Sequence, residues 1–163
     1  MPLRPIAQKN STGCFIACVA MLLDKTYDEA FQLLHPGKNS TETYEHGFRD
    51  HSMSNVANKL LQKIGFRSRT SRYKKFRTFQ KRVNKHAIMI IRWKFDPERC
   101  HCILFDADAK TFIDPGGGHI VTSRYLLKSF QSQLDSAIII EQIPELKNSN
   151  DIPRTDDALG LAW

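Results

Sequence analysis

Long apolar runs are missing from this sequence of 163 residues. The apolar runs that it does have, such as Phe15–Leu23 and Ala137–Ile140, are far shorter than the roughly 20 apolar residues that a transmembrane helix needs. The N-terminal segment 1–13 also lacks the apolar stretch of a secretory signal peptide. We therefore expect a soluble, cytoplasmic protein with no membrane span.

Cysteine is scarce as well, and its four positions are Cys14, Cys18, Cys100 and Cys102. A chain of this length can bury a sufficient core without disulfides, and these spacings differ from those of a secreted disulfide scaffold. Together with His101 the cysteines resemble a zinc set. However, neighbouring residues of a strand point to opposite faces, so Cys100 and Cys102 would point away from His101. The sequence favours a reducing compartment, and we expect no metal and no other cofactor.

Acidic residues are absent between Phe66 and Phe95, where eleven Lys and Arg side chains supply much of the net charge of +7. Such an excess favours an acidic partner, which can be nucleic acid, an anionic membrane or an acidic protein. The simpler interpretation of a basic run is a solvated helix face.

The basic segment, residues 67–85, contains aromatic residues that are best explained as the buried side of a basic helix: Tyr73, Phe76 and Phe79. The aromatic interleaving typical of RNA-binding modules is missing. A nucleic-acid-binding protein with a purely structural Cys14 remains the non-enzymatic alternative, but nucleic acid is not the partner that we expect.

Helical patterns precede strand patterns along the chain. Helices are predicted over Cys14–Asp24, Tyr27–His35, 52–65, Lys74–Asn84 and 123–134. Strands are predicted over 66–73, His86–Trp93, Cys100–Asp106, Thr111–Asp114 and 136–143. This order predicts an α+β fold in which N-terminal helices pack on a C-terminal antiparallel sheet. One domain spans residues 1–146 in this interpretation, and a mobile tail follows over 147–163.

Cys14 lies at the predicted start of a buried helix, one turn before Cys18. The unpaired N–H groups and the dipole of a helix N-terminus stabilise a thiolate, which is the nucleophilic form of cysteine. Ser11 or Thr12 is expected to cap this helix. Gly13 is expected to let the backbone turn sharply and to leave room for a substrate beside the sulfur. We predict a reactive Cys14 and a Cys18 that packs in the core.

A thiolate needs a base or an imidazolium as its partner. His101 stands out among the six histidines because it lies inside a predicted strand. Asp114 ends the next strand. A hairpin that turns at residues 107–108 puts His101 directly opposite Asp114, and a turn at 108–109 puts Asp114 one diagonal step away. Both registers place the two side chains on one face, where the carboxylate would fix the tautomer of the imidazole. The alternative is that Asp114 only caps the turn before Pro115.

Gln8 lies six residues before Cys14. A side-chain amide N–H near the sulfur can join the Cys14 N–H in stabilising the oxyanion that forms when a thiolate attacks a carbonyl. The alternative is an exposed polar residue in an N-terminal segment. Together with His101 and Asp114, these two residues predict a cysteine hydrolase that acts on a peptide or amide bond.

In this order and spacing, these residues resemble the papain-like cysteine peptidases, and within them the C39-like group of bacteriocin-processing peptidases. That group has a Gln six residues before a Cys at a helix start, a His that opens an apolar strand, and an Asp-Pro pair on the next strand, here Asp114-Pro115. The resemblance covers about residues 6–143. It implies a papain-like fold and a stand-alone peptidase domain, with Cys14, His101 and Asp114 as the catalytic triad and Gln8 as the oxyanion donor.

The chain departs from this family after the nucleophile, where Phe15 replaces the usual Gly. We expect Phe15 to change the wall of the substrate pocket, and Gly13 and Phe15 to contact the substrate. Many members are fused to an ABC exporter, whereas a free-standing, basic version fits stand-alone leader peptidases and bacterial toxins or effectors delivered into the cytoplasm of a target cell.

The expected partners are a protein or peptide substrate and an inhibitory immunity protein, because such toxins usually travel with one. The basic segment would attract an acidic substrate or inhibitor. Protein deamidation, transglutamination and acyl transfer use the same Cys–His pair, so they remain open beside proteolysis.

Overall fold

A computed structural model describes residues 2–40, 53–72, 75–92, 100–130 and 133–145 of the chain. The helices are α1 (Cys14–Leu23), α2 (Tyr27–Leu34), α3 (Met53–Lys63), α4 (Phe76–Arg82) and α5 (Ser123–Phe130). The strands are β1 (Arg67–Ser71), β2 (Ala87–Arg92), β3 (Cys100–Asp106), β4 (Thr111–Asp114), β5 (His119–Val121) and β6 (Gln133–Gln142). The described chain is thus a mixture of helices and antiparallel sheet, which is the α+β class that the sequence predicts.

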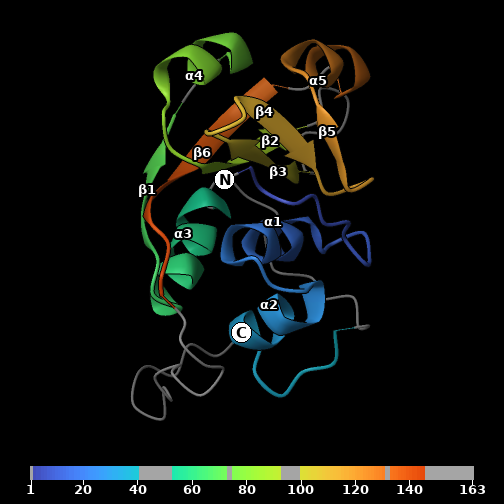
Figure 1. The fold of residues 1–163 in the computed structure, drawn as a ribbon, viewed down its shortest axis with the longest axis vertical. Coiled ribbons are helices and arrows are strands. Elements are labelled where there is room, and N and C mark those ends of the chain that lie inside the picture. Colours follow the sequence, from blue (N-terminus) through green and yellow to red (C-terminus); the bar gives the residue numbers. More distant parts are fainter. Residues whose placement is uncertain (1, 41–52, 73–74, 93–99, 131–132, 146–163) are drawn as a thin grey trace.

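The strands form one sheet in the order β1-β6-β2-β3-β4-β5, and every hydrogen-bonded pair is antiparallel (Figure 1). β2 lies between β6 and β3, and all of its residues except Arg92 are buried. A continuous apolar run is expected for a strand covered on both faces. β6 follows the other described strands in the sequence, yet it lies between β1 and β2.

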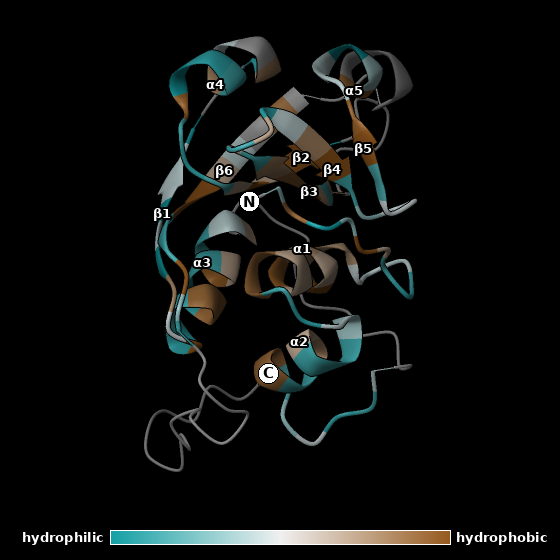
Figure 2. Cartoon of the chain, viewed as in Figure 1, coloured by the Kyte–Doolittle hydropathy of each residue, from teal (hydrophilic) through white to brown (hydrophobic). Residues whose placement is uncertain are grey.

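Helices cover both faces of the sheet. α1 and α3 lie on one side with α2 beneath them, and α4 and α5 lie on the other side (Figure 1). The core is accordingly divided into two buried clusters, because successive side chains of β2 point to opposite faces of the sheet. Ile88 and Ile90 belong to the cluster that contains α1, whereas Met89 and Ile91 belong to the cluster on the α4 side. α1 is apolar along its whole length (Figure 2), as expected for a helix packed between the sheet and α2.

The N-terminus of α1 differs from the prediction. Gly13 is its N-cap residue, so neither Ser11 nor Thr12 caps the helix. The Thr12 N–H and hydroxyl both donate to Asn10 Oδ1, so the polar groups of this turn are already engaged before the helix begins. Burial holds α1 instead, because nine of its ten residues are buried.

The predicted basic helix corresponds to α4. Phe76 and Phe79 are buried on its inner side, whereas Lys81 and Arg82 are exposed, which confirms the interpretation of the aromatic residues as a buried face. Tyr73 and the predicted C-terminal tail lie outside the described residues. Over the described ranges, no helix has both the length and the apolarity that crossing a bilayer requires.

Asp106 organises the turn between β3 and β4. Its Oδ1 accepts the N–H groups of Asp108 and Ala109, and its Oδ2 accepts the N–H of Leu3 at 2.8 Å. His86 lies beside it, and His86 Nδ1 accepts the N–H of Ala107. Side chains of His86, Asp106 and Asp108 come close enough to suggest a metal site, but backbone N–H groups already occupy both oxygens of Asp106. We therefore assign this cluster to the turn.

Replacing Asp106 with Ala is expected to lower the free energy of unfolding by about 3 kcal/mol, because three backbone N–H groups lose a buried charged acceptor. Denaturant unfolding followed by circular dichroism measures this loss. Asp28→Ala is the matched control, since Asp28 is hydrogen-bonded but exposed, and exposed ion pairs contribute about 1 kcal/mol or less. Equal losses in the two variants would contradict the assignment.

Candidate active site

α1 places the sulfur of Cys14 against β3. Cys14 is the first residue of the helix, so its backbone N–H has no acceptor inside the helix. Its Sγ accepts the N–H of Cys102 at 3.4 Å, and the side chains of His101 and Cys102 also hydrogen-bond to it. Only 6% of Cys14 is exposed. A buried sulfur is thus surrounded by hydrogen-bond donors.

His101 lies on β3 and Asp114 ends β4. Leu104 pairs with Ile113, which corresponds to the second of the two registers considered from the sequence and puts Asp114 one diagonal step from His101. Nε2 of His101 lies 2.8 Å from Oδ1 of Asp114. Their side chains are 12% and 6% exposed. Because Asp114 engages Nε2, Nδ1 is the ring nitrogen left for Cys14.

The electrostatics of these groups favour a thiolate and an imidazolium. The pKa of Cys14 is held well below that of an ordinary thiol, first by the hydrogen bond from Cys102. Burial opposes this shift, and the hydrogen bond and charge of His101 add to it. Burial opposes the charged form of His101, but hydrogen bonds to Asp114 and Cys14 outweigh it and raise the pKa of His101 to about 9. Burial also opposes the charge of Asp114, yet its hydrogen bonds from His101 and Gly116 lower its pKa.

Gln8 reaches the same region through the N-terminal segment. Its backbone N–H donates to the carbonyl of Pro115, the residue after Asp114. Its side-chain Nε2 donates to the Asn10 carbonyl at 2.8 Å, and its Oε1 is buried without a hydrogen-bond partner. An amide nitrogen carries two N–H groups, and Asn10 uses one of them.

The turn over residues 115–118 supports this placement. The Gly116 N–H donates to Asp114 Oδ1 at 2.8 Å. Gly118 has a φ of +62°, and a Cβ added there would lie 3.0 Å from the backbone nitrogen of Ala7. The run of glycines therefore lets the N-terminal segment pass close to Asp114.

Gly13 is required for a reason different from the expected one. Its φ of −85° is open to any residue. However, a Cβ at this position would lie 2.2 Å from the hydroxyl oxygen of Tyr27, so the space beside Gly13 is filled by Tyr27 rather than left for a substrate. Tyr27 is buried, and burial followed by the charge of Cys14 raises the pKa of Tyr27 to about 12.

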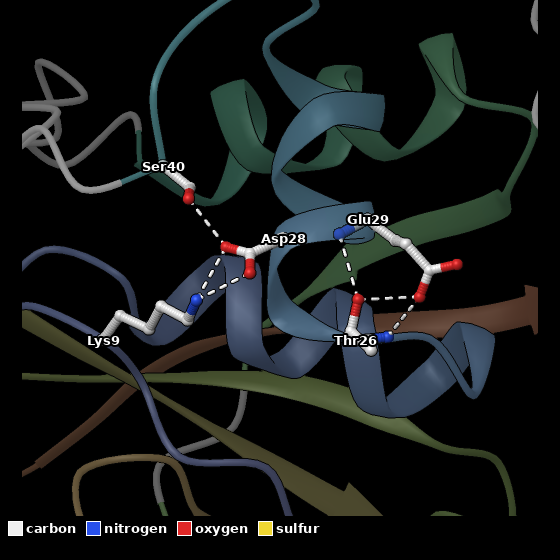
Figure 3. A network of polar contacts seen from close by, with 5 residues as sticks. All are labelled: Lys9, Thr26, Asp28, Glu29 and Ser40. Carbon is white, nitrogen blue, oxygen red and sulfur yellow. Dashed lines mark hydrogen bonds and ion pairs between the residues drawn. The ribbon is translucent and has the colours of Figure 1, made fainter.

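An ion pair ties the loop after Gln8 to α2. Lys9 Nζ lies 2.7 Å from Asp28 Oδ2, and Ser40 donates to the same carboxylate (Figure 3). Thr26 and Glu29 form a capping box at the start of α2 (Figure 3), which fixes the helix end that carries Asp28. The loop is thus held at both ends, by α2 and by Pro115.

Phe15 and Cys18 are residues of α1 that lie in the core, and they are 1% and 0% exposed. Phe15 therefore has almost no surface open to a substrate. Burial raises the pKa of Cys18 well above that of an ordinary thiol, which suits the core role predicted for it. The basic strand β1 is separated from β3 by β6 and β2, so the exposed charges of β1 lie away from Cys14.

The structure brings Cys14, His101 and Asp114 into one chain of hydrogen bonds, and the backbone of Gln8 is hydrogen-bonded to Pro115, the residue after Asp114. Three neighbours of this site are not predicted from the sequence: Cys102, Gly116 and Tyr27. Cys102 had a signal, because it directly follows His101. Gly116 had one too, because an Asp side chain commonly accepts the N–H two residues later in a turn. Tyr27 had none, since only the fold brings it to the site.

The chain matches no protein-family model and no curated protein. The functional interpretation therefore depends on the geometry. A buried thiol at a helix N-terminus, hydrogen-bonded to an imidazole that a carboxylate orients, has the arrangement needed for nucleophilic attack on a carbonyl.

Proposed function

We propose that this chain is a cysteine peptidase of the papain-like superfamily, similar to the C39-like group. The observation that carries the proposal is the hydrogen-bonded series Cys14–His101–Asp114, in which His101 Nε2 lies 2.8 Å from Asp114 Oδ1. The lowered pKa of Cys14 and the raised pKa of His101 support a thiolate–imidazolium pair at neutral pH.

In the proposed reaction, the Cys14 thiolate attacks the carbonyl carbon of a peptide bond. The resulting oxyanion accepts hydrogen bonds from the Cys14 N–H and the second N–H of Gln8 Nε2. His101 donates its proton to the leaving amine, which departs as the acyl-enzyme forms. His101 then takes a proton from water, and the resulting hydroxide attacks the carbonyl carbon of the acyl-enzyme. The acid product is released, and the Cys14 thiolate and the His101 imidazolium are restored. Asp114 keeps Nε2 of His101 engaged, so Nδ1 faces the sulfur throughout.

Protein deamidation is the second candidate, because the same steps applied to a side-chain amide release ammonia instead of a peptide. Incubation of a cell lysate with the wild-type protein, followed by mass spectrometry, distinguishes the two. New protein termini are expected for a peptidase, and the mass increase of amide-to-acid conversion is expected for a deamidase.

Cys14→Ala is the reference for this experiment, because it removes the sulfur and no other group of the proposed site. Cys18→Ala is the matched control, since it removes a buried thiol of the same helix and is expected to leave the products unchanged. Identical products from wild-type and Cys14→Ala protein would exclude both enzymatic proposals.

A further inference from the structure

Cys102 is a second thiol at the candidate active site. It follows His101 on β3 and is completely buried on the face of the sheet that packs against α1. Its backbone N–H points at the sulfur of Cys14, 3.4 Å away, although 88 residues separate the two in sequence. Its side chain also forms a hydrogen bond with the side chain of Cys14. One residue thus approaches the proposed nucleophile with both of its donors.

We propose that Cys102 is a positioning residue of the active site, whose S–H and N–H both donate to Cys14 Sγ and thereby hold it as a thiolate facing His101. This inference rests on the proposed function, because a resting thiolate at Cys14 is part of that function. Cys102 touches no reacting bond of the substrate and acts through the sulfur of Cys14.

The burial of Cys14 explains why such donors are needed. A thiolate removed from water loses its hydration, and only hydrogen bonds or positive charges can offset that loss. His101 provides one donor and the charge, but it must give up its proton during the reaction. Donors that keep their protons during the whole reaction therefore have a separate role, which is to stabilise the buried sulfur after His101 has given up its proton.

Cys102 is suited to remain a donor. Its hydrogen bond to Cys14, its burial and the charge of the neighbouring sulfur hold the pKa of Cys102 well above that of an ordinary thiol. The Cys102 S–H therefore keeps its proton when Cys14 has lost its own. Cys18 is equally buried and lies one turn along α1, yet it makes no hydrogen bond that lowers the pKa of Cys14.

The test is the pH dependence of Cys14 alkylation by iodoacetamide, followed at the Cys14 peptide by mass spectrometry. Its midpoint reports the thiol pKa and needs no substrate. Cys102→Ala removes the S–H but keeps the backbone N–H, and is expected to move the midpoint upward by about one pH unit. Cys102→Ser supplies a hydroxyl donor and is expected to return the midpoint most of the way to the wild-type value.

Two further variants separate this inference from the proposed function. Cys18→Ala removes a neighbouring thiol without removing a donor, and its midpoint is expected to match the wild type. His101→Ala is expected to move the midpoint upward; if it does not, the proposed thiolate–imidazolium pair is wrong. Suppose that His101→Ala does shift the midpoint. The role of Cys102 as a side-chain donor is then overturned if the Cys102→Ala midpoint equals that of Cys18→Ala. It is also overturned if Cys102→Ser shifts the midpoint as far as Cys102→Ala does.

Discussion

His101→Ala is expected to lower the rate of peptide cleavage by about 10⁴-fold. The variant loses the positive partner that favours the Cys14 thiolate and also the acid that protonates the leaving amine. A fluorogenic peptide built on a cleavage site found in the lysate experiment allows kcat/KM to be measured for this comparison.

The pH profile sharpens this prediction. In the wild type, we expect the rate to fall at low pH, where Cys14 becomes protonated, and to fall again as pH rises through about 9, where His101 loses its proton. Without His101, the fall above about 9 should disappear and the rate should rise with thiolate formation. The two limbs thus report on different residues.

His119→Ala is the matched control for His101. Its imidazole is exposed and packs against Tyr125 and Gly117 rather than against Cys14. It is expected to retain cleavage and both limbs of the profile. A loss in His101→Ala no larger than in His119→Ala would show that His101 is not the proton donor.

Gln8→Ala is expected to lower kcat by about 100- to 1000-fold, which is the usual effect of removing one oxyanion donor. KM should change little, because the donor acts on charge that develops only in the transition state. Gln8→Glu has nearly the same shape but no side-chain N–H, so it should lose at least as much activity. Both variants keep the backbone hydrogen bond to Pro115.

Alkylation separates an oxyanion role from a general disturbance of the site. Iodoacetamide reacts with the Cys14 thiolate without forming an oxyanion, so its rate at Cys14 should be unchanged in Gln8→Ala. A parallel fall of alkylation and cleavage would mean that Gln8 only positions the loop before Cys14.

The secondary structure could be predicted where periodicity is strong. The mixed pattern of α2 indicates a helix with one buried stripe. The run of β2 is apolar throughout, and its shortness and its three isoleucines indicate a strand buried on both faces. The pairing of β3 with β4 was narrowed to two registers by the turn between them. The parity of side chains in a strand then required His101 and Asp114 to share a face.

The remaining features of the fold and of the site depend on contacts that no local sequence pattern encodes. The three residues of β5 are too few for a period to be seen. Gly13 was expected to leave open space, but Tyr27 fills that space from another helix. The hydrogen bond of Cys102 to Cys14 joins segments 88 residues apart, so its existence follows only from how α1 packs on β3.

The place of β6 in the sheet determines when Cys14 and His101 can meet during protein synthesis. β6 ends at Gln142, yet it supplies the pairing between β1 and β2. A nascent chain that has not reached this strand lacks one whole neighbour of β2, and β2 in turn carries β3 with His101. Such long-range pairing forms late. The proposed hydrolytic activity should therefore be latent on the ribosome, so that proteins beside the emerging chain escape cleavage until β6 has been made.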